Sequence, residues 1–412
     1  MKRLTFRGMV GYGVANLGAN LAYAFANFAF PLFLTAYPIP IVLVGFLAQE
    51  RSFVGGFVQP FIGALSDRLP PNRLGRRRPF FLVGVPLTAA SLIFLSTYPA
   101  LWAVVAIMTV FSFFLAIAYI PYLALLADIA PSEQRGRVGG VMAVFTMLGT
   151  TAVAVLAYLF WNSQQAVVFW AVAIGIVLSF AVTSFAIREP AAAPSADSDG
   201  THFTVRAYIK ELSQHRELLK YMAVMFFFWL GNGGLTPFLT RFGVEVLGLA
   251  ANTSFLLLAP AIVGAAFFAI PAGISTERFG KKPVLAVGLF LFGLMGVLAA
   301  QFAQPISQAP VLMLVAIPVA MLIIGIANAI TTTLLIPLLM DLIPETRAGE
   351  LTGVGSLVAS LAQPIGAVIA GGAADLAGTL RWAFFIGGAA MLLSFVILLS
   401  VDVARAMRDA TH

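Results

Sequence analysis

The chain has 412 residues, of which 60% are hydrophobic and 10% are charged, and its formal net charge is +7. A typical soluble domain has about 25% charged residues, so a water-soluble fold of this size could not bury so much apolar surface. The chain contains no cysteine, which excludes disulfides, thiolate catalysis and cysteine-ligated metals. This composition predicts a protein that is embedded in a lipid bilayer.

Twelve apolar stretches are long enough to cross a bilayer as helices, since about 20 residues span about 30 Å of hydrocarbon. The first is too long for a signal-peptide core and lacks a small-residue cleavage site, so we expect it to be retained as the first helix. In chain order the stretches lie near residues 9–36, 41–66, 79–97, 101–127, 138–161, 166–187, 219–242, 252–275, 283–302, 311–340, 350–374 and 382–402. The predicted fold class is an all-α membrane protein with twelve transmembrane helices.

The lysine and arginine residues predict the orientation. With a cytoplasmic N-terminus, 21 of the 24 basic residues fall in cytoplasmic segments, and the exceptions are Arg51, Arg241 and Arg381. This asymmetry follows the positive-inside rule, so we expect a multi-pass protein of the cell (inner) membrane with both termini in the cytoplasm. Nucleic-acid binding is not expected, because it needs basic residues gathered on one solvated domain.

A polar stripe follows one face of the first span. Asn16, Asn20, Tyr23 and Asn27 are spaced by four, three and four residues, which places them on one side of a helix. Such a stripe either holds helices together or lines a substrate site. Three asparagines with a tyrosine are more than packing usually needs, so we favour a substrate site.

The second span carries adjacent ionisable residues, Glu50 and Arg51, near its middle. Each costs at least ~2.5 kcal/mol at that depth, so such groups are kept where they face protein or water. All three histidines lie in predicted cytoplasmic segments, so a proton relay in the membrane has to use carboxylates. Glu50, with Arg51 beside it, is therefore the main candidate for ion coupling. A sodium ion held by Glu50 and amide oxygens is an alternative, and so is a buried ion pair that only fixes helix packing.

Polar residues of other spans extend the candidate substrate site. They carry amide, hydroxyl or aromatic groups, which suit a neutral polyhydroxylated ligand because amides bind hydroxyls and aromatic faces cover sugar rings. An anionic substrate would need more arginines than Arg51, although Arg51 alone could still bind one carboxylate. The predicted substrate-binding residues are Asn20, Tyr23, Asn27, Gln59, Tyr119, Trp229, Asn232, Asn328 and Gln363.

The chain consists of two similar halves. The segment from Gly63 to Arg68 recurs from Gly273 to Arg278, and residues 121–131 recur at 334–344 with a constant offset of 213. Such internal repeats predict a duplicated bundle of six helices. The predicted divisions are 1–187, a cytoplasmic linker 188–217, and 218–412. The linker carries either a short amphipathic helix or only a solvated connection.

Two aspartates, Asp128 and Asp341, recur at equivalent places near the ends of their spans. Asp128 is either a second candidate for proton coupling or, like Asp341, the partner of a basic loop. We favour ion pairs, for Asp128 with the arginines of residues 76–78 and for Asp341 with Arg278 or Lys281. The loop arginines can also bind anionic lipid head groups, and a carboxylate can sit at a helix N-terminus. The residues predicted to hold one conformation are Asp67, Arg68, Arg76, Arg77, Arg78 and Asp341.

The loop between the second and third spans carries a resemblance. The pattern Gly-x-x-x-Asp-Arg followed by Gly-Arg-Arg-Arg-Pro, at residues 63–68 and 75–79, resembles the signature loop of the major facilitator superfamily. More narrowly, residues 58–68, 74–80 and 124–128 resemble the plant sucrose–proton symporters and their animal relatives, in the glycoside–pentoside–hexuronide-like branch. The resemblance implies two pseudo-symmetric six-helix bundles and secondary active transport.

The residues and the resemblance together predict a proton-coupled symporter of a sugar or a similar neutral solute. The alternative is a proton-driven exporter of drugs or lipophilic metabolites, which would fit the 36 phenylalanines, although a lipid-facing surface explains them equally. An enzyme is not expected, because the spans show no nucleophile–base pair or metal-ligand cluster. We expect a monomer that needs no cofactor or metal and meets a small-molecule substrate, protons and the lipid bilayer.

Overall fold

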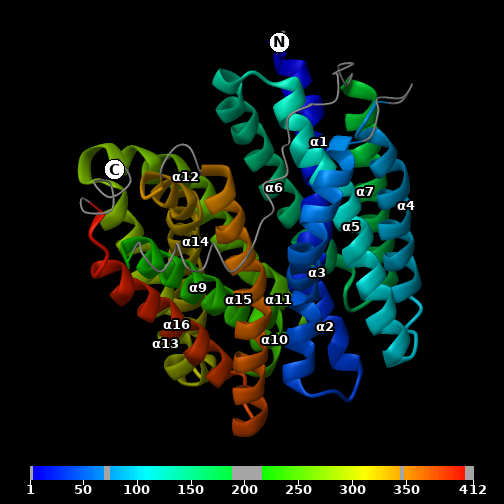
Figure 1. Ribbon diagram of the computed structural model, residues 1–412. Helices are drawn as coiled ribbons and strands as arrows, with labels where there is room; N and C mark the ends of the chain where they lie inside the picture. Colours follow the sequence, from blue (N-terminus) through cyan, green and yellow to red (C-terminus); the bar gives the residue numbers. More distant parts are fainter. Residues whose placement is uncertain (1–2, 69–74, 188–215, 344–347, 404–412) are drawn as a thin grey trace. The chain divides into compact units, whose positions relative to one another are not determined.

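The computed structural model describes residues 3–68, 75–187, 216–343 and 348–403, and the elements within these ranges are helical (Figure 1). Twelve of the described helices are long and apolar enough to cross a membrane. The prediction of an all-α membrane protein with twelve spans is therefore confirmed. Most of the predicted linker, including its amphipathic helix, lies outside the described residues.

The six spans before residue 188 are mostly single helices. The first is interrupted by a π-helical turn and ends in a 3₁₀ turn, and the others are continuous. Their bounds are Phe6–Ala24 for α1, Phe25–Ala29 for the π-helical turn, Phe30–Phe33 for α2, Leu34–Ala36 for the 3₁₀ turn, Ile41–Arg68 for α3, Arg78–Leu95 for α4, Leu101–Ile129 for α5, Ser132–Phe160 for α6 and Gln165–Ala186 for α7.

The six later spans follow the same plan, with 3₁₀ turns inside the seventh and the eighth. Their bounds are Arg216–Leu235 for α9, Thr236–Phe238 for a 3₁₀ turn, Leu239–Glu245 for α10, Ala251–Ser254 for α11, Phe255–Leu257 for a second 3₁₀ turn, Leu258–Phe279 for α12, Lys281–Ser307 for α13, Pro310–Asp341 for α14, Ala348–Ala377 for α15 and Arg381–Leu399 for α16.

The described chain divides into two compact units. The first contains the residues up to Tyr37 and those from Phe53 to the end of α7, and the second contains Pro38–Ser52 and the residues from α9 onward. Helix α3 is therefore divided between the units, and its first part, up to Ser52, packs with the second. Glu50 and Arg51 belong to this part.

The same helix pairings recur in both units. In the first unit, α1 packs against α6 and α7, and α4 packs against α5 and α7. In the second, α9 packs against α15 and α16, and α13 packs against α14 and α16. These helices follow one another in the same chain order, so the pairings are equivalent, as a duplicated bundle requires.

Individual hydrogen bonds are duplicated as well. The Tyr12 hydroxyl donates to the Tyr122 carbonyl at 2.8 Å, and the Tyr221 hydroxyl donates to the Leu335 carbonyl at 2.6 Å. All four residues are buried, and each bond joins the opening helix of a repeat to the fourth span of the same repeat. A buried phenol needs an acceptor, and here both halves supply a carbonyl at the equivalent place.

A second duplicated contact joins the first and last spans of each repeat. The Thr183 hydroxyl donates to the Gly11 carbonyl at 2.7 Å and accepts from the Ala15 N–H at 2.9 Å. These are the two groups that an α-helix would bond to each other, so the hydroxyl is inserted into the backbone ladder of α1. In the second unit, Ser394 donates to the Val224 carbonyl at 2.8 Å.

The opening span of each repeat is interrupted near a proline. A π-helical turn, Phe25–Ala29, precedes Pro31, and a 3₁₀ turn, Thr236–Phe238, contains Pro237. Proline lacks the N–H that would bond the carbonyl four residues earlier, so a regular helix cannot continue through it unchanged. Discontinuous spans of this kind form substrate and ion sites in transporters. The predicted site residue Asn27 lies in the first of these turns.

Arg381 illustrates how a freed carbonyl is satisfied. Pro305 lies inside α13 and removes the N–H that would bond the Gln301 carbonyl. The Arg381 guanidinium donates to that carbonyl at 3.3 Å, to the Ala300 carbonyl at 2.6 Å and to Gln304 Oε1 at 2.8 Å. This explains one of the three basic residues that depart from the predicted charge asymmetry, because Arg381 stabilises a proline-containing helix.

The duplicated tyrosine bonds predict matched losses of stability. We expect Tyr12→Phe and Tyr221→Phe each to lower the free energy of unfolding by about 0.5–1.5 kcal/mol, because each removes one buried hydrogen bond without changing the packed ring. Thermal unfolding of the purified protein in detergent measures the effect. Tyr98→Phe is the control, since Tyr98 is 48% exposed. Wild-type stability in both buried variants would contradict the duplicated role.

Candidate functional site

Helix α3 begins on a carboxylate from α15. The Asp375 side chain accepts hydrogen bonds from the N–H groups of Ile41 and Val42, both at 2.8 Å. N–H groups in the first turn of a helix have no partner within it, and the positive end of the helix dipole favours a carboxylate. A Cβ on Gly371 would lie 2.7 Å from the Val42 Cα, so the glycine allows α15 to approach closely. These contacts fix where the polar residues further along α3 lie.

Four consecutive residues of α3, Gln49 to Ser52, are polar or charged. Glu50 is 6% exposed and Gln49 is 2% exposed, while Arg51 and Ser52 are half-buried. The Ser52 hydroxyl lies 2.5 Å from Oε1 of Gln363 on α15 and 3.3 Å from Oε1 of Gln49. The Ser52 hydroxyl therefore connects this part of α3 to α15 through two amides.

Helix α9 meets α15 at the same glutamine. Gly233 of α9 lies against the backbone of Gln363, and a Cβ at this position would clash with it. The close approach of α9 and α15 therefore requires a glycine. On the adjoining turn, Asn232 Oδ1 accepts from the Thr236 hydroxyl at 3.3 Å. Trp229 is half-buried, and its buried Nε1 has no hydrogen-bond partner among the described residues. Since a buried indole N–H usually finds an acceptor, Trp229 can offer this donor to a ligand.

An aromatic group connects α1 and α5 in the first unit. The rings of Tyr12 and Tyr122 are stacked with centroids 4.6 Å apart, Tyr119 lies 5.8 Å from Tyr122, and Tyr23 meets Tyr119 edge-to-face at 5.3 Å. Tyr12 and Tyr122 are fully buried, whereas Tyr23 and Tyr119 are half-buried. The two half-buried rings form an aromatic surface that could cover the apolar face of a bound ring.

The asparagines of the polar stripe bind α6. Asn16 Nδ2 donates to the Met142 carbonyl at 2.8 Å and to the Thr146 hydroxyl at 2.7 Å. Asn20 Nδ2 donates to the Asn16 carbonyl at 2.8 Å and to the same hydroxyl at 3.2 Å. These bonds belong to helix packing. Asn16 is buried and Asn20 is half-buried, so Asn20 keeps some accessible surface beside its packing contacts.

The remaining predicted substrate residues lie in different surroundings. Asn27 and Asn328 are half-buried, and Gln59 is exposed on α3. The Asn328 carbonyl accepts from the Thr332 hydroxyl at 2.7 Å. Among the described residues, no three His, Asp or Glu side chains are grouped so that they could hold a metal ion.

The start of α4 is joined to the end of α5 by an ion pair. Arg77 Nε donates to Asp128 Oδ2 at 2.6 Å, and Arg76 approaches the same oxygen at 3.4 Å. Arg77 also donates to the Ser66 hydroxyl at 3.1 Å. Arg76 and Arg77 are buried, and Asp128 therefore has the basic partners that the sequence predicted for it.

The second unit repeats this ion pair with a lysine. Lys281 Nζ lies 2.7 Å from both carboxylate oxygens of Asp341 and 3.4 Å from the Pro337 carbonyl. The predicted pairing of Asp341 with Arg278 or Lys281 is thus found with Lys281. Asp67 and Arg68 end α3, but their side chains lie outside the described residues.

Three residues near the predicted site were not predicted from the sequence. Gln49 and Ser52 directly flank the ionisable pair, and their polarity within an apolar span was an available signal. Asp375 lies in the eleventh span and gave no such signal, because its partners are backbone N–H groups. Its role depends on a contact between helices that are distant in the sequence.

Comparison with known families decides the identity of the fold. A profile described as Major Facilitator Superfamily matches residues 12–267 and 252–411. The chain belongs to the major facilitator superfamily. It is therefore a transporter and not an enzyme. An uncharacterised transporter of this superfamily from Methanocaldococcus jannaschii is 23% identical over 295 residues, which are 70% of each chain.

Solved structures of transporters share the fold. A nucleoside transporter aligns with 96% of this chain and 99% of its own, at 12% identity and a TM-score of 0.75. A D-xylose–proton symporter aligns with 96% of both chains, at 15% identity and a TM-score of 0.69. A POT family transporter crystallised with 5-aminolevulinic acid also aligns with 96% of both chains, at 13% identity and a TM-score of 0.73.

The ion pair between α4 and α5 predicts a change in rate. If the pair has its predicted role of holding one conformation without contacting the solute, we expect Arg77→Ala to slow transport about fivefold or more and to leave the affinity for the transported solute unchanged. Initial uptake rates and equilibrium binding to the purified protein measure the two quantities. Arg137→Ala, on the exposed surface of α6, is the control. Weaker binding with an unchanged rate would show that Arg77 belongs to the solute site.

Proposed function

We propose that this transporter works by alternating access and carries a sugar, or a similar neutral polyhydroxylated solute, together with protons. The proposal places it in the cell (inner) membrane with both termini in the cytoplasm, as its basic residues predict. The resemblance of residues 58–68 and 74–80 to sucrose–proton symporters supports the solute class. The observation that carries the coupling is the burial of Glu50 within a membrane span.

Glu50 is the tenth residue of α3, which begins at Ile41, and is 6% exposed. At 1.5 Å per residue it lies about 14 Å along the helix, close to half the thickness of a hydrocarbon core of about 30 Å. A carboxylate at the centre of a span is costly, and ionisable groups there mark ion pathways and proton relays by default. Asp128 and Asp341, by contrast, lie at the ends of their helices. Glu50 is therefore the better carrier of the coupled proton, and Asp128 is the second candidate.

The internal repeat shows that the fold does not require this acid. When Gly63 is aligned with Gly273, the positions equivalent to Glu50 and Arg51 are Pro260 and Ala261. The duplicated features, such as Asp128 with Asp341, stabilise both halves alike. A costly pair of ionisable residues present in only one half points to a role in transport.

The residues of the proposed site can form hydrogen bonds but carry little charge, which favours a neutral polyhydroxylated solute. In the second unit these are the Trp229 indole N–H, Asn232 and Gln363, and in the first they are the half-buried Tyr23 and Tyr119. Amide and indole groups bind hydroxyls, and aromatic rings pack against the apolar face of a sugar. Asn20, Asn27, Gln59 and Asn328 complete the proposed set.

A thermal-shift screen of the purified protein against sugars, sugar acids and common drugs tests the solute class, because a bound ligand raises the apparent stability. Stabilisation by a neutral sugar supports the proposal. Stabilisation by lipophilic drugs alone, together with drug sensitivity of cells that lack the protein, would instead favour a proton-driven exporter.

The coupling role predicts the behaviour of Glu50→Gln. The amide cannot carry a proton, so we expect accumulation of the sugar against its gradient to be lost, while exchange of labelled for unlabelled sugar across the membrane continues. Proteoliposomes with an imposed pH gradient measure both activities. Glu133→Gln, at an exposed position of α6, should retain both. Uphill accumulation at the wild-type level in Glu50→Gln would remove Glu50 from the coupling mechanism.

The indole of Trp229 predicts a loss of affinity. Trp229→Phe keeps an aromatic ring but removes the N–H donor, and one neutral hydrogen bond is worth about two- to tenfold in Kd. Isothermal titration calorimetry with the sugar found in the screen measures the change. Trp170→Phe is the control, since Trp170 is 47% exposed on α7. Unchanged affinity in a folded Trp229→Phe protein would exclude the indole N–H from the site.

A further inference from the structure

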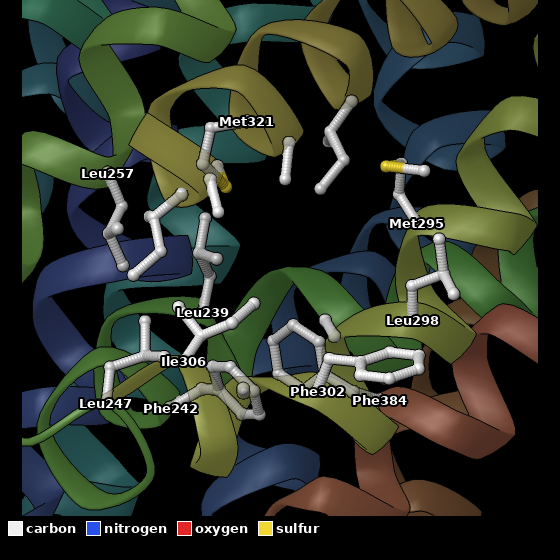
Figure 2. Close-up of a pocket in the computed structure, with 16 residues that line it drawn as sticks. Leu239, Phe242, Leu247, Leu257, Met295, Leu298, Phe302, Ile306, Met321 and Phe384 are labelled. Carbon is white, nitrogen blue, oxygen red and sulfur yellow. The ribbon is translucent and has the colours of Figure 1, made fainter. Parts of the chain in front are cut away.

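The second unit contains an apolar cavity of about 260 Å³. Its wall is formed by aliphatic, aromatic and methionine side chains of α10, α13, α14 and α16 and of the segments that flank α11. Figure 2 shows Met321 and Met295 above an open centre and Phe242 and Phe302 below it. Since no lining side chain carries a charged or amide group, a sugar would lose its hydrogen bonds with water and gain none here.

The cavity lies beside an exposed apolar surface of the unit. Phe302 lines it and is 53% exposed, whereas the neighbouring lining residue Ala303 is 4% exposed. The first turns of α14, next to its lining residues, present Val311, Leu314 and Val315 at 80%, 77% and 62% exposure. An exposed apolar surface on a membrane span suits contact with hydrocarbon, so acyl chains of the bilayer can lie against it.

A cation lies on the same stretch of α13. The Arg381 guanidinium binds the Ala300 carbonyl and Gln304, and the residues on either side of Ala300 that line the cavity are Ala299 and Ala303. A guanidinium has five N–H donors, and its bonds to α13 use three of them. The next residue, Trp382, is 48% exposed, and aromatic residues of this kind favour the level of the lipid head groups.

We propose that this cavity binds one acyl chain of a bilayer phospholipid, whose phosphate lies at Arg381. The size and apolar wall suit a hydrocarbon chain, since apolar cavities stay dry and take apolar guests. An empty cavity of this size leaves its lining atoms without contacts on one side, which an inserted chain restores. The arginine supplies the charge that a phosphodiester requires and that a neutral lipophilic solute does not. This lipid site is separate from the proposed sugar and proton sites.

The test uses the full chain in liposomes that contain a phosphatidylglycerol with a diazirine at the end of one acyl chain. After illumination, peptide mapping by mass spectrometry locates the label. We expect wild-type protein to be labelled at cavity residues such as Met295 and Met321. Unlabelled phosphatidylglycerol in excess should compete, whereas the same amount of a diacylglycerol should compete far less, because it has the acyl chains but lacks the phosphodiester.

Cavity-filling variants give the matched comparison. Ala303→Leu combined with Ala320→Leu occupies the space, and overpacking of this kind should reduce labelling of the cavity about tenfold. Val319→Leu adds one methylene on the 49%-exposed surface of α14 and should be labelled like the wild type. Thermal unfolding shows whether the double variant is folded, and Ala299→Val is the milder substitute if it is not.

Four results would overturn the proposal. The first is equal labelling of Met295 and Met321 in a folded, cavity-filled variant. The second is label confined to surface residues such as Val315 and Val319. Equal competition by the diacylglycerol would remove the role of the phosphate, and selective competition by a lipophilic drug would assign the cavity to a different occupant.

Discussion

Polar groups inside a bilayer have no water to bind, and this constraint decides how the helices of this transporter meet. A hydroxyl inserted between Gly11 and Ala15 lets α7 attach to the backbone of α1. Arg381 stabilises the carbonyl that Pro305 leaves without an N–H. Side chains thus supply what hydrocarbon cannot. We infer that the buried carboxylate of Glu50 and the indole N–H of Trp229 serve transport and not the fold alone.

The internal repeat helps to distinguish polar residues that stabilise the fold from those that serve transport. Tyr12 and Tyr221 donate equivalent hydrogen bonds, and Asp128 and Asp341 form equivalent ion pairs. Each half thus satisfies its polar groups in the same way. Glu50 has no acidic equivalent in the second half. We therefore infer that the duplicated polar groups stabilise each bundle, whereas Glu50, which has an acid at its position in only one half, couples solute movement to a proton.

The sequence predicted the features that depend on composition along a single helix. It was less informative about features that depend on contacts between helices. Hydropathy alone predicts the twelve spans. The recurrence of an aspartate beside a basic loop in each half predicts the ion pairs of Asp128 and Asp341. The contact of Asp375 with the start of α3 is an example of the second kind, because Asp375 binds backbone N–H groups and so leaves no sequence pattern. The stripe containing Asn16 and Asn20 was ambiguous, because asparagine at helical spacing serves packing and ligand binding equally well, and only the bonds to α6 reveal the packing.

The most direct test of the account is the number of protons taken up when the sugar binds. Calorimetric titrations of the purified protein, made over a range of pH in buffers with different ionisation enthalpies, measure this number. The account predicts uptake of about one proton per solute, because proton and sugar binding are reciprocally linked. Sugar binding with no proton uptake at any pH at which the protein stays folded would contradict it.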